Sequence, residues 1–449
     1  MTGLSLHNIA ELCGGTYHGP AGLGAVCPNE IVIDSRKVTP GNLFAALPGE
    51  KVDGHSFVGK ALDAGAAGCL VTHVPAGETR PLVVVQDVAK AMSAIAMVYR
   101  DSLTIPIIGV TGSVGKTTMK EMVACVLGTR YSVLKTEQNF NNDLGVPMTV
   151  SRIQPEHQAA VIEMGISHFG EMAGLAEIVR PTMAVYTNIG YSHLEALGDR
   201  RGVLKEKTGM LPYMPLTGTA FFNGDDDLLA GYECGYLETI TFGVGEACDI
   251  RAENIHMIGR ETTCDIVCGD RRFPVVIHAY GKHMVTAALG AAAVGLNVGL
   301  SDADIAAGIA AYAPVGGRAA LEETGYLTII NDCYNANPDS MGAALESLSM
   351  LPGWKVAILG DMYELGPDSP QMHREMGEKA AACGIHGVIA VGELARDIAA
   401  GHGNSLHFET KEALISELPK LIPRGATVLV KASHGLHLEA VVEALEGLK

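Results

Sequence analysis

The most informative stretch of this sequence is Ile107-Ile-Gly-Val-Thr-Gly-Ser-Val-Gly-Lys-Thr-Thr118. Apolar and β-branched residues at 105–110 predict a buried strand, and the apolar spacing of 119–127 predicts a helix. Glycine has no Cβ atom, so the backbone between these elements can turn tightly and point N–H groups at an anion. The stretch therefore predicts a phosphate-binding loop between a strand and a helix.

The end of this loop carries residues suited to a nucleotide. Lys116 would reach the terminal phosphates, and the Thr117 hydroxyl would coordinate Mg²⁺. The usual pattern, G-x-x-x-x-G-K-[ST], needs glycine where this chain has Val110, so the first glycine is displaced to Gly112. A Gly-rich turn without a ligand would not require lysine followed by threonine. We therefore favour nucleotide binding.

Composition restricts the class of protein. A chain of 449 residues with 48% hydrophobic residues and 54 glycines fits an α/β fold of several domains. The charge of −18, from 32 basic and 50 acidic residues, argues against nucleic acid or an anionic membrane as the main partner. We find no basic and apolar leader segment and no apolar run long enough to span a membrane. We expect a cytoplasmic protein and a monomer.

The order of predicted elements divides the chain into three α/β domains. Residues 1–103 would form a small domain that includes a strand at 31–36. Residues 104–314 would contain the phosphate loop, a parallel sheet and a β-hairpin at 248–280. Residues 315–449 alternate strands with helices, which predicts a dinucleotide-fold-like parallel sheet. The pattern G-x-G-x-x-G is absent from this last part, so no NAD site is implied.

Two segments of the middle domain place polar residues near the predicted phosphate loop. Glu163 ends the apolar strand 159–163, where a carboxylate can hold Mg²⁺ beside a phosphate loop. Residues 136–147 are predicted as a loop, and their three asparagines within four residues indicate hydrogen bonding to a polar ligand. His193 follows another strand, but a lone histidine is more often structural than a ligand.

Other polar residues have simple explanations. The acidic cluster 225–227 follows a strand and is most simply a solvated loop. Ser35, Arg36, Asp53 and His55 fit ordinary strand-end and capping chemistry as well as they fit a ligand site. The residues themselves leave these two interpretations open.

Several segments together resemble the Mur ligases, which are ATP-dependent amide-forming enzymes of bacterial wall synthesis. They are the loops at 111–118 and 139–147, Glu163 at a strand end, and Asn188-Ile-Gly-x-x-His-Leu-Glu195. Three further segments resemble the uridine-nucleotide domain of the members that extend the peptide: Asp34-Ser-Arg36, Gly41-Asn-Leu-Phe44 and Asp53-Gly-His55. The resemblance covers the whole chain.

Two segments of the last domain narrow the resemblance. Asn331-Asp-Cys-Tyr-Asn-Ala-Asn-Pro338 and Asp361-Met-Tyr-Glu-Leu-Gly366 are similar to the members that add D-alanyl-D-alanine to a UDP-N-acetylmuramoyl-tripeptide. Members that add a diamino acid typically have Asp-Tyr-Ala-His-x-Pro in place of the segment at 331–338. The implied fold is α/β with three domains: a central P-loop-type parallel sheet, an N-terminal uridine-nucleotide domain and a C-terminal dinucleotide-fold-like domain that binds the dipeptide and closes on ATP.

The resemblance also implies a chemistry and a set of residues. ATP would phosphorylate the tripeptide carboxylate, and the dipeptide amine would attack the acyl phosphate. Two Mg²⁺ ions would take part, the first held by Thr117 and Glu163 and the second by His193. Lys207 matches a family lysine that can carry a carbamate.

The implied catalytic residues are Lys116, Glu163, His193 and Lys207. The implied ATP-binding residues are Thr111, Gly112, Ser113, Val114, Gly115, Lys116, Thr117, Thr118, Arg318 and Asp332. The implied substrate-binding residues are Ser35, Arg36, Asp53, His55, Asn139, Asn142, Asn335 and Asn337.

Two other functions remain as alternatives. A Mur-type ligase that adds a single amino acid would share the fold, but the segment at 331–338 argues against it. A regulatory P-loop ATPase or GTPase would bind partners instead of joining substrates, and a GTPase would carry a motif such as Asn-Lys-x-Asp, which this sequence lacks.

The chain departs from the family pattern at one place. It has Met284 and Ala287 where the family often has asparagine near the nucleotide.

Overall fold

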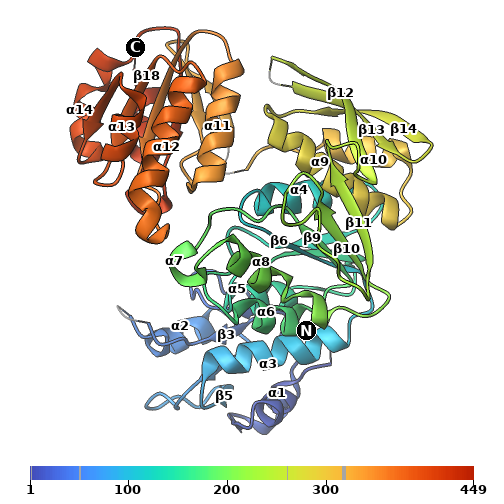
Figure 1. Ribbon diagram of the computed structural model, residues 1–449. Coiled ribbons are helices and arrows are strands. Elements are labelled where there is room, and N and C mark those ends of the chain that lie inside the picture. The colour runs from blue at the N-terminus through green and yellow to red at the C-terminus, as the bar shows by residue number, and fades with distance from the viewer. Residues whose placement is uncertain (2, 50–51, 260, 316–319, 449) are drawn as a thin grey trace.

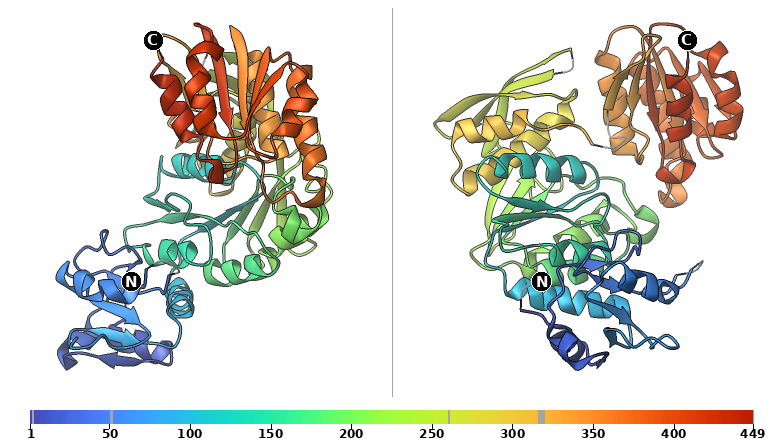
Figure 2. Two further views of the ribbon diagram at one scale, coloured as in Figure 1. Left: turned by 90° about the vertical axis from the view of Figure 1, so that its left-hand side faces the viewer. Right: turned by 180° about the vertical axis from the view of Figure 1, so that it is seen from behind.

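The computed structural model describes residues 1, 3–49, 52–259, 261–315 and 320–448. It has three β-sheets, and helices pack against each of them (Figure 1). The N-terminal and C-terminal parts of the chain lie at opposite ends of the central part in all three views (Figure 2). Among these residues no helix combines the length and the apolar character that a membrane crossing requires.

The first sheet has five strands in the order β1-β5-β4-β3-β2, and β1 is the antiparallel member. Its strands are β1 (Thr16–His18), β2 (Ile31–Val32), β3 (Leu43–Ala45), β4 (Gly68–Val71) and β5 (Leu82–Val84). The helices of this part are α1 (Leu6–Leu12), α2 (Val58–Asp63) and α3 (Val88–Asp101). The predicted strand at 31–36 is too long, because Lys37 N–H bonds back to Asp34 O and turns the chain. Ser35 and Arg36 therefore lie in a turn after β2.

The second sheet has nine strands in the order β14-β13-β12-β11-β10-β9-β6-β8-β7. Its strands are β6 (Ile107–Thr111), β7 (Val133–Lys135), β8 (Ala159–Glu163), β9 (Met183–Tyr186), β10 (Thr219–Asn223), β11 (Glu238–Gly243), β12 (Ile250–Ile258), β13 (Glu261–Cys268) and β14 (Arg271–Ile277). Its helices are α4 (Lys116–Leu127), α5 (Gly145–Ser151), α6 (Glu171–Val179), α7 (Leu194–Leu197), α8 (Arg200–Thr208), α9 (Lys282–Asn297) and α10 (Asp302–Ala310). The predicted hairpin at 248–280 is confirmed and extended, because β12, β13 and β14 form two successive antiparallel pairs.

The alternation of side chains along β6 explains why this sheet is covered on both faces. Ile107 belongs to a core that includes helices α3, α5 and α6, whereas Ile108 and Val110 belong to a core that includes α4, α9 and α10. Helix α3 belongs to the first segment of the chain but packs against α5 and α6 of the central part (Figure 1). The first and second sheets are thus joined through a shared hydrophobic core.

The third sheet has six strands in the order β15-β16-β20-β17-β18-β19. Its strands are β15 (Ala320–Glu323), β16 (Thr328–Asn331), β17 (Trp354–Gly360), β18 (Gly387–Val391), β19 (Ser405–Phe408) and β20 (Ala426–Lys431). Its helices are α11 (Pro338–Met350), α12 (Ser369–Ala382), α13 (Arg396–His402), α14 (Lys411–Leu421) and α15 (Glu439–Glu446). Apart from β15, every strand pair in it is parallel, so the predicted parallel α/β arrangement is confirmed.

One predicted loop ends earlier than we expected. The segment 136–147 is a loop only to residue 144, because α5 begins at Gly145. Pro147 lies in the first turn of this helix, where a missing backbone N–H costs nothing. The side-chain oxygen of Asn142 accepts a hydrogen bond from Gly145 N–H at 2.9 Å, which helps to start the helix.

Candidate functional site

The strand order places three strand ends at one edge of the central sheet. Strand β6 lies between β8 and β9, and all three run parallel. Val110 is paired with Glu163 of β8, and Thr111 is paired with Tyr186 of β9. The predicted phosphate loop after β6, the carboxylate that ends β8 and the loop after β9 therefore meet at the same edge.

The conformation of the phosphate loop depends on its two glycines. Gly112 and Gly115 have φ angles of 150° and 79°, which side chains other than glycine rarely adopt. A Cβ atom on Gly112 would lie 1.9 Å from Thr187 Oγ1, so the backbone also passes too close to the residue after β9 for any side chain. Helix α4 begins at Lys116, directly after Gly115, so its N-terminal N–H groups end at this loop.

Glu163 is held at the base of the loop by several polar contacts. Its side chain is 2% exposed and accepts hydrogen bonds from Thr117 Oγ1 and from Asn141 Nδ2, each at 2.8 Å. Its backbone N–H donates to Thr136 Oγ1 at 3.0 Å. A threonine hydroxyl and a carboxylate are hard oxygen donors, so the two residues fit Mg²⁺ bound beside a phosphate. The sequence does not single out Asn141 within the asparagine-rich segment, because a local pattern does not show which amide faces Glu163.

Lys120 is a second residue that the sequence did not single out. It lies one turn after Lys116 in α4, its side chain is 1% exposed, and its Nζ donates to Thr136 O at 2.7 Å. The same nitrogen lies 3.0 Å from Glu121 Oε1 and 3.8 Å from Glu163 Oε2. Lys120 therefore balances part of the buried negative charge below the phosphate loop.

We predict that Lys120→Met lowers the free energy of unfolding by about 3–5 kcal/mol, because it leaves buried carboxylates without their cation. Lys135→Met is the matched control. Lys135 also pairs with Glu121, but its side chain is 41% exposed, and such pairs contribute at most about 1 kcal/mol. Urea unfolding followed by circular dichroism measures both effects. Equal losses in the two variants would contradict this account of Lys120.

The loop after β9 is bonded directly to the phosphate loop. Asn188 O accepts from Ser113 N–H at 3.0 Å, and Asn188 Oδ1 accepts from Val114 N–H at 2.8 Å. His193 ends this loop with a positive φ of 55°, and its Nδ1 pairs with the carboxylate of Glu364 from the C-terminal part of the chain. His193 lines the same cavity as Thr117 and Glu163, so both the structural role and the ligand role fit its position, and the ligand role stays a prediction.

A cavity of about 1120 Å³ lies between the central and C-terminal domains. It brings together most of the residues that we predicted for ATP, metal and dipeptide binding, and Met284 and Ala287 also line it. The predicted residues on its wall are Ser113, Val114, Gly115, Lys116, Thr117, Thr118, Asn139, Asn142, Glu163, His193, Asp332, Asn335 and Asn337. Thr111, the last residue of β6, and Gly112, which follows it, do not line the cavity. Arg318 lies outside the described residues.

The C-terminal domain contributes a buried cation, Lys431, to the cavity. Asp332 follows β16, and its Oδ2 lies 2.6 Å from Nζ of Lys431, the last residue of β20. Lys431 also donates to Asn335 O at 2.9 Å and is 2% exposed, so it fixes the start of the segment 335–337. Nothing in the sequence pattern singles out Lys431 among the residues that end strands.

Asn335 and Asn337 stand before helix α11, as the position of Pro338 predicts. Pro338 is the first residue of this helix, and Asn337 is its N-cap. Asn337 Oδ1 accepts from Ser340 N–H at 2.9 Å, so that oxygen is engaged in capping. Asn335 Oδ1 accepts from Ala336 N–H at 2.9 Å. A ligand would therefore meet chiefly the amide NH₂ groups of these two residues.

Lys207 is fully buried in α8, away from the cavity wall. Burial lowers its pKa well below the usual value, and the nearby charge of Lys116 lowers it further, while Glu206 acts in the opposite direction. The carboxylate of Glu206 accepts hydrogen bonds from Gly170 N–H and Met172 N–H, so it also serves the start of α6. The environment of Lys207 thus favours the neutral amine that carbamate formation requires.

The predicted residues of the N-terminal domain make local contacts instead. Arg36 Nη2 lies 2.8 Å from Asp34 Oδ2, and Asp53 Oδ1 lies 2.7 Å from His55 Nδ1. His55 Nε2 accepts from Thr72 N–H at 2.9 Å. None of the four predicted residues, all of which the structure describes, lines the cavity between the other two domains. Their capping and turn contacts are observed, and a ligand role for them stays a prediction.

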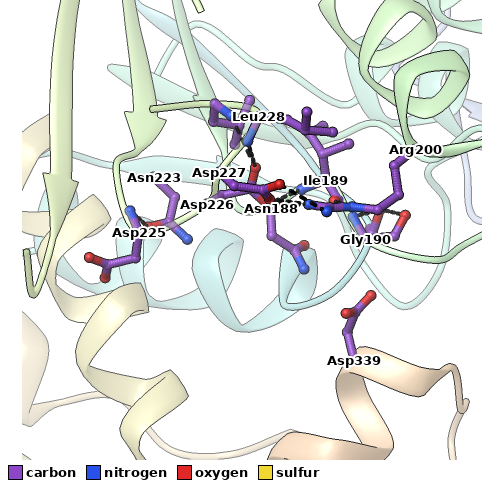
Figure 3. Close-up of polar contacts among 12 residues, drawn as sticks. Asn188, Ile189, Gly190, Arg200, Asn223, Asp225, Asp226, Asp227, Leu228 and Asp339 are labelled. Atoms are coloured by element: carbon purple, nitrogen blue, oxygen red, sulfur yellow. Dashed lines mark hydrogen bonds and ion pairs between the residues drawn. The ribbon is translucent and has the colours of Figure 1, made fainter. Parts of the chain in front are cut away.

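The acidic cluster 225–227 is exposed at Asp225 and Asp227, as a solvated loop predicts, but Asp226 is largely buried and all three carboxylates bind other loops. Asp226 Oδ2 accepts from Ile189 N–H at 2.8 Å, and its Oδ1 accepts from Leu228 N–H at 3.0 Å (Figure 3). Asp227 pairs with Arg200, and Asp225 accepts from Val244 N–H at 2.8 Å. The loops after β9, β10 and β11 have backbone N–H groups without partners in the sheet, and these carboxylates satisfy several of them. The cluster therefore organises the neighbouring loops.

Comparison with known proteins identifies the family. The description "Mur ligase family, catalytic domain" matches residues 29–116, "Mur ligase middle domain" matches 110–295, and "Mur ligase, glutamate ligase domain" matches 317–434. The chain belongs to the Mur ligase family, as the sequence motifs predicted.

Particular members of the family resemble the chain over nearly its full length. It is 35% identical to the UDP-N-acetylmuramoyl-tripeptide--D-alanyl-D-alanine ligase of Escherichia coli (strain K12), with 99% of each chain covered. It is 36% identical to the ligase of the same name from Bacillus subtilis (strain 168), with 98% of each covered. The crystal structure of MurF from Acinetobacter baumannii superimposes with a TM-score of 0.89 at 30% identity, with 98% of each chain covered. This similarity confirms the predicted three-domain α/β fold.

Proposed function

We propose that this protein is an ATP-dependent ligase that joins D-alanyl-D-alanine to a UDP-N-acetylmuramoyl-tripeptide. One observation carries the proposal: a single cavity is lined by the phosphate loop of the central domain and by the segment 335–337 of the C-terminal domain. The full-length similarity to ligases named for this reaction supports it. A MurF ligase structure from Thermotoga maritima in complex with ADP, with a TM-score of 0.83 and 28% identity, supports ATP as the nucleotide.

The proposed reaction has two steps. The γ-phosphoryl group of ATP passes to the terminal carboxylate of the tripeptide, which yields an acyl phosphate and ADP. The dipeptide amine then forms a C–N bond to the acyl carbon, the C–O bond to phosphate breaks, and the nitrogen loses a proton. Backbone N–H groups of 112–117 and the charge of Lys116 would stabilise the negative charge that develops on the phosphoryl group.

Thr117 and Glu163 would hold one Mg²⁺ ion, and His193 would contribute to a second. When bound, such ions neutralise phosphate charge and orient the reacting oxygens. Asp332 is proposed to contact the ribose, and Arg318 to reach the phosphates. Among the residues that the structure describes, no group of three or more His, Cys, Asp or Glu side chains could hold a metal by itself. This agrees with ions that share their coordination with ATP.

We assign the three domains to residues 1–103, 104–314 and 315–449. The first would bind the uridine nucleotide through Ser35, Arg36, Asp53 and His55, and Asn139 and Asn142 would contact the peptide. The reaction consumes ATP, so the proposed setting is the cytoplasm, with the enzyme acting as a monomer.

Lys207 is proposed to carry a carbamate. We predict a carbamate carbon resonance in ¹³C NMR spectra of the protein in ¹³C-bicarbonate, because burial favours the neutral amine. The resonance should disappear in Lys207→Met and remain in Lys205→Met, an exposed lysine of the same helix. Turnover should fall by at least about tenfold in Lys207→Met only. A signal that survives Lys207→Met would place the modification on another residue.

The proposed function is tested by phosphate release. Purified protein with ATP, Mg²⁺ and the UDP-linked tripeptide should release phosphate only when D-alanyl-D-alanine is added, and mass spectrometry should detect the pentapeptide nucleotide. Release with a single amino acid in place of the dipeptide would indicate the other class of Mur ligase. Release without any acceptor or tripeptide would indicate a regulatory NTPase.

A further inference from the structure

The loop 188–193, which carries His193, is fixed on one side by the central domain. Ile189 donates its N–H to Asp226 Oδ2 at 2.8 Å and accepts from Arg200 Nε at 2.8 Å (Figure 3). Arg200 in turn pairs with Asp227. The backbone N–H and C=O of Ile189 are therefore both bound by charged side chains, which fixes the first half of the loop.

The other side of this loop is contacted by the C-terminal domain. Asp339 is the second residue of α11, and its Oδ2 accepts from Tyr191 N–H at 2.7 Å. A Cβ atom on Gly190 would lie 1.9 Å from the same oxygen, so only glycine allows the carboxylate to approach this closely. Figure 3 shows the Asp339 side chain pointing from the start of its helix toward Gly190. Burial raises the pKa of Asp339, while the Tyr191 N–H and the charge of Arg200 lower it.

The contacted loop continues directly into the phosphate site. Gly190 N–H donates to Ser113 Oγ at 2.9 Å, and Ser192 Oγ donates to the same atom at 2.9 Å. Asp339 itself stands two residues after Asn337, the helix cap on the cavity wall. An unbroken series of contacts therefore runs from the segment 335–337 through Asp339 and Gly190 to the phosphate loop.

We propose that Asp339 is a positioning residue, which fixes the loop 188–193 and thereby His193 and Ser113 when the C-terminal domain is seated on the central domain. This proposal rests on the ligase function proposed above. We take the segment 335–337 to bind the dipeptide, and the proposal explains why the helix after this dipeptide segment begins with a carboxylate aimed at another domain. The phosphate loop and the dipeptide segment are then correctly placed at the same time, which the transfer between their substrates requires.

A simpler role for Asp339 would be to stabilise α11, because an acidic residue in the first turn complements the helix dipole. The two roles predict different behaviour of the conservative variant. Asp339→Asn keeps a side-chain oxygen that can accept from Tyr191 N–H but removes the charge. If the contact with Tyr191 matters, asparagine restores function, whereas a dipole role would be lost in asparagine and alanine alike.

The experiment compares kinetics of full-length variants with both substrates. We expect Asp339→Ala to lower kcat/KM by about ten- to a hundredfold, the value of a hydrogen bond to a charged group, and Asp339→Asn to stay within a few-fold of the original protein. Gly190→Ala should cause a similar loss, because its Cβ atom would displace Asp339.

The double variant Gly190→Ala/Asp339→Ala should be no worse than either single variant, since both act on one contact. Asp302→Ala, which removes a first-turn carboxylate from α10, is the matched control and should keep full activity.

Small-angle X-ray scattering of the same variants separates this proposal from the proposed function. Asp339→Ala and Gly190→Ala should increase the radius of gyration, and Asp339→Asn should not. Kinetics and scattering like those of the original protein in Asp339→Ala would overturn the proposal, as would an asparagine variant that behaves like alanine. If the original protein fails to use the dipeptide but Asp339→Ala still opens the structure, the contact stands and the proposed function is wrong.

Discussion

Lys116→Ala should lower turnover by at least about a hundredfold while the protein stays folded. The Nζ of Lys116 donates to Gly112 O at 2.9 Å and to Ser113 O at 3.3 Å, so it already lies over the phosphate loop. Removing one such charge from a phosphoryl-transfer site costs about 10²–10³ in kcat. A lysine at the first position of a helix opposes the helix dipole, so alanine should not reduce stability.

The control is Lys411→Ala. Lys411 is also the first residue of a helix, α14, but it contacts Leu436 O and has no part in the proposed site. Turnover should be close to that of the original protein in this variant. Initial rates of phosphate release, together with circular dichroism of each variant, measure the difference. A folded Lys116→Ala protein with near-normal turnover would show that the loop does not act on the phosphates of ATP.

The parts of the site that sequence predicts are those that depend on backbone topology. A glycine-rich turn between a strand and a helix has few conformations, so the positions of Lys116 and Thr117 follow from the motif. Glu163 follows from the rule that parallel strands end at one edge of a sheet, and its pairing with Val110 agrees with that rule. Local patterns fix these residues because each lies at the end of a regular element.

The residues that sequence does not predict act through contacts between distant segments. Lys120 lies inside a helix with no pattern that marks it, and only the fold shows that it faces Glu163. Asp339 and Tyr191 are separated by 148 positions, so no local pattern relates them. The cluster 225–227 looks polar and solvated in the sequence, but Asp226 is needed to bind backbone N–H groups that become available only when the loops assemble.

The contacts of Asn337 allow its two roles to be separated. Its Oδ1 caps α11, and serine at an N-cap stabilises a helix about as well as asparagine. Asn337→Ser should therefore keep the thermal stability of the protein while it removes the amide NH₂ group. We propose that this group donates a hydrogen bond to the dipeptide carboxylate. Asn337→Asp should also keep the cap, but it places a negative charge beside that carboxylate.

We predict that Asn337→Ser raises the KM for D-alanyl-D-alanine by about ten- to a hundredfold, the value of a hydrogen bond to a charged group, and that Asn337→Asp raises it further. The KM for ATP should change by less than about threefold in both, because Asn337 is not among the residues that we propose to bind ATP. Steady-state kinetics with each substrate varied in turn, and thermal unfolding of each variant, test this. Two results would contradict this prediction: an unchanged dipeptide KM in Asn337→Ser, or KM values for ATP and dipeptide that rise together. Asn337 would then serve only the helix, and other residues of the cavity would bind the dipeptide carboxylate.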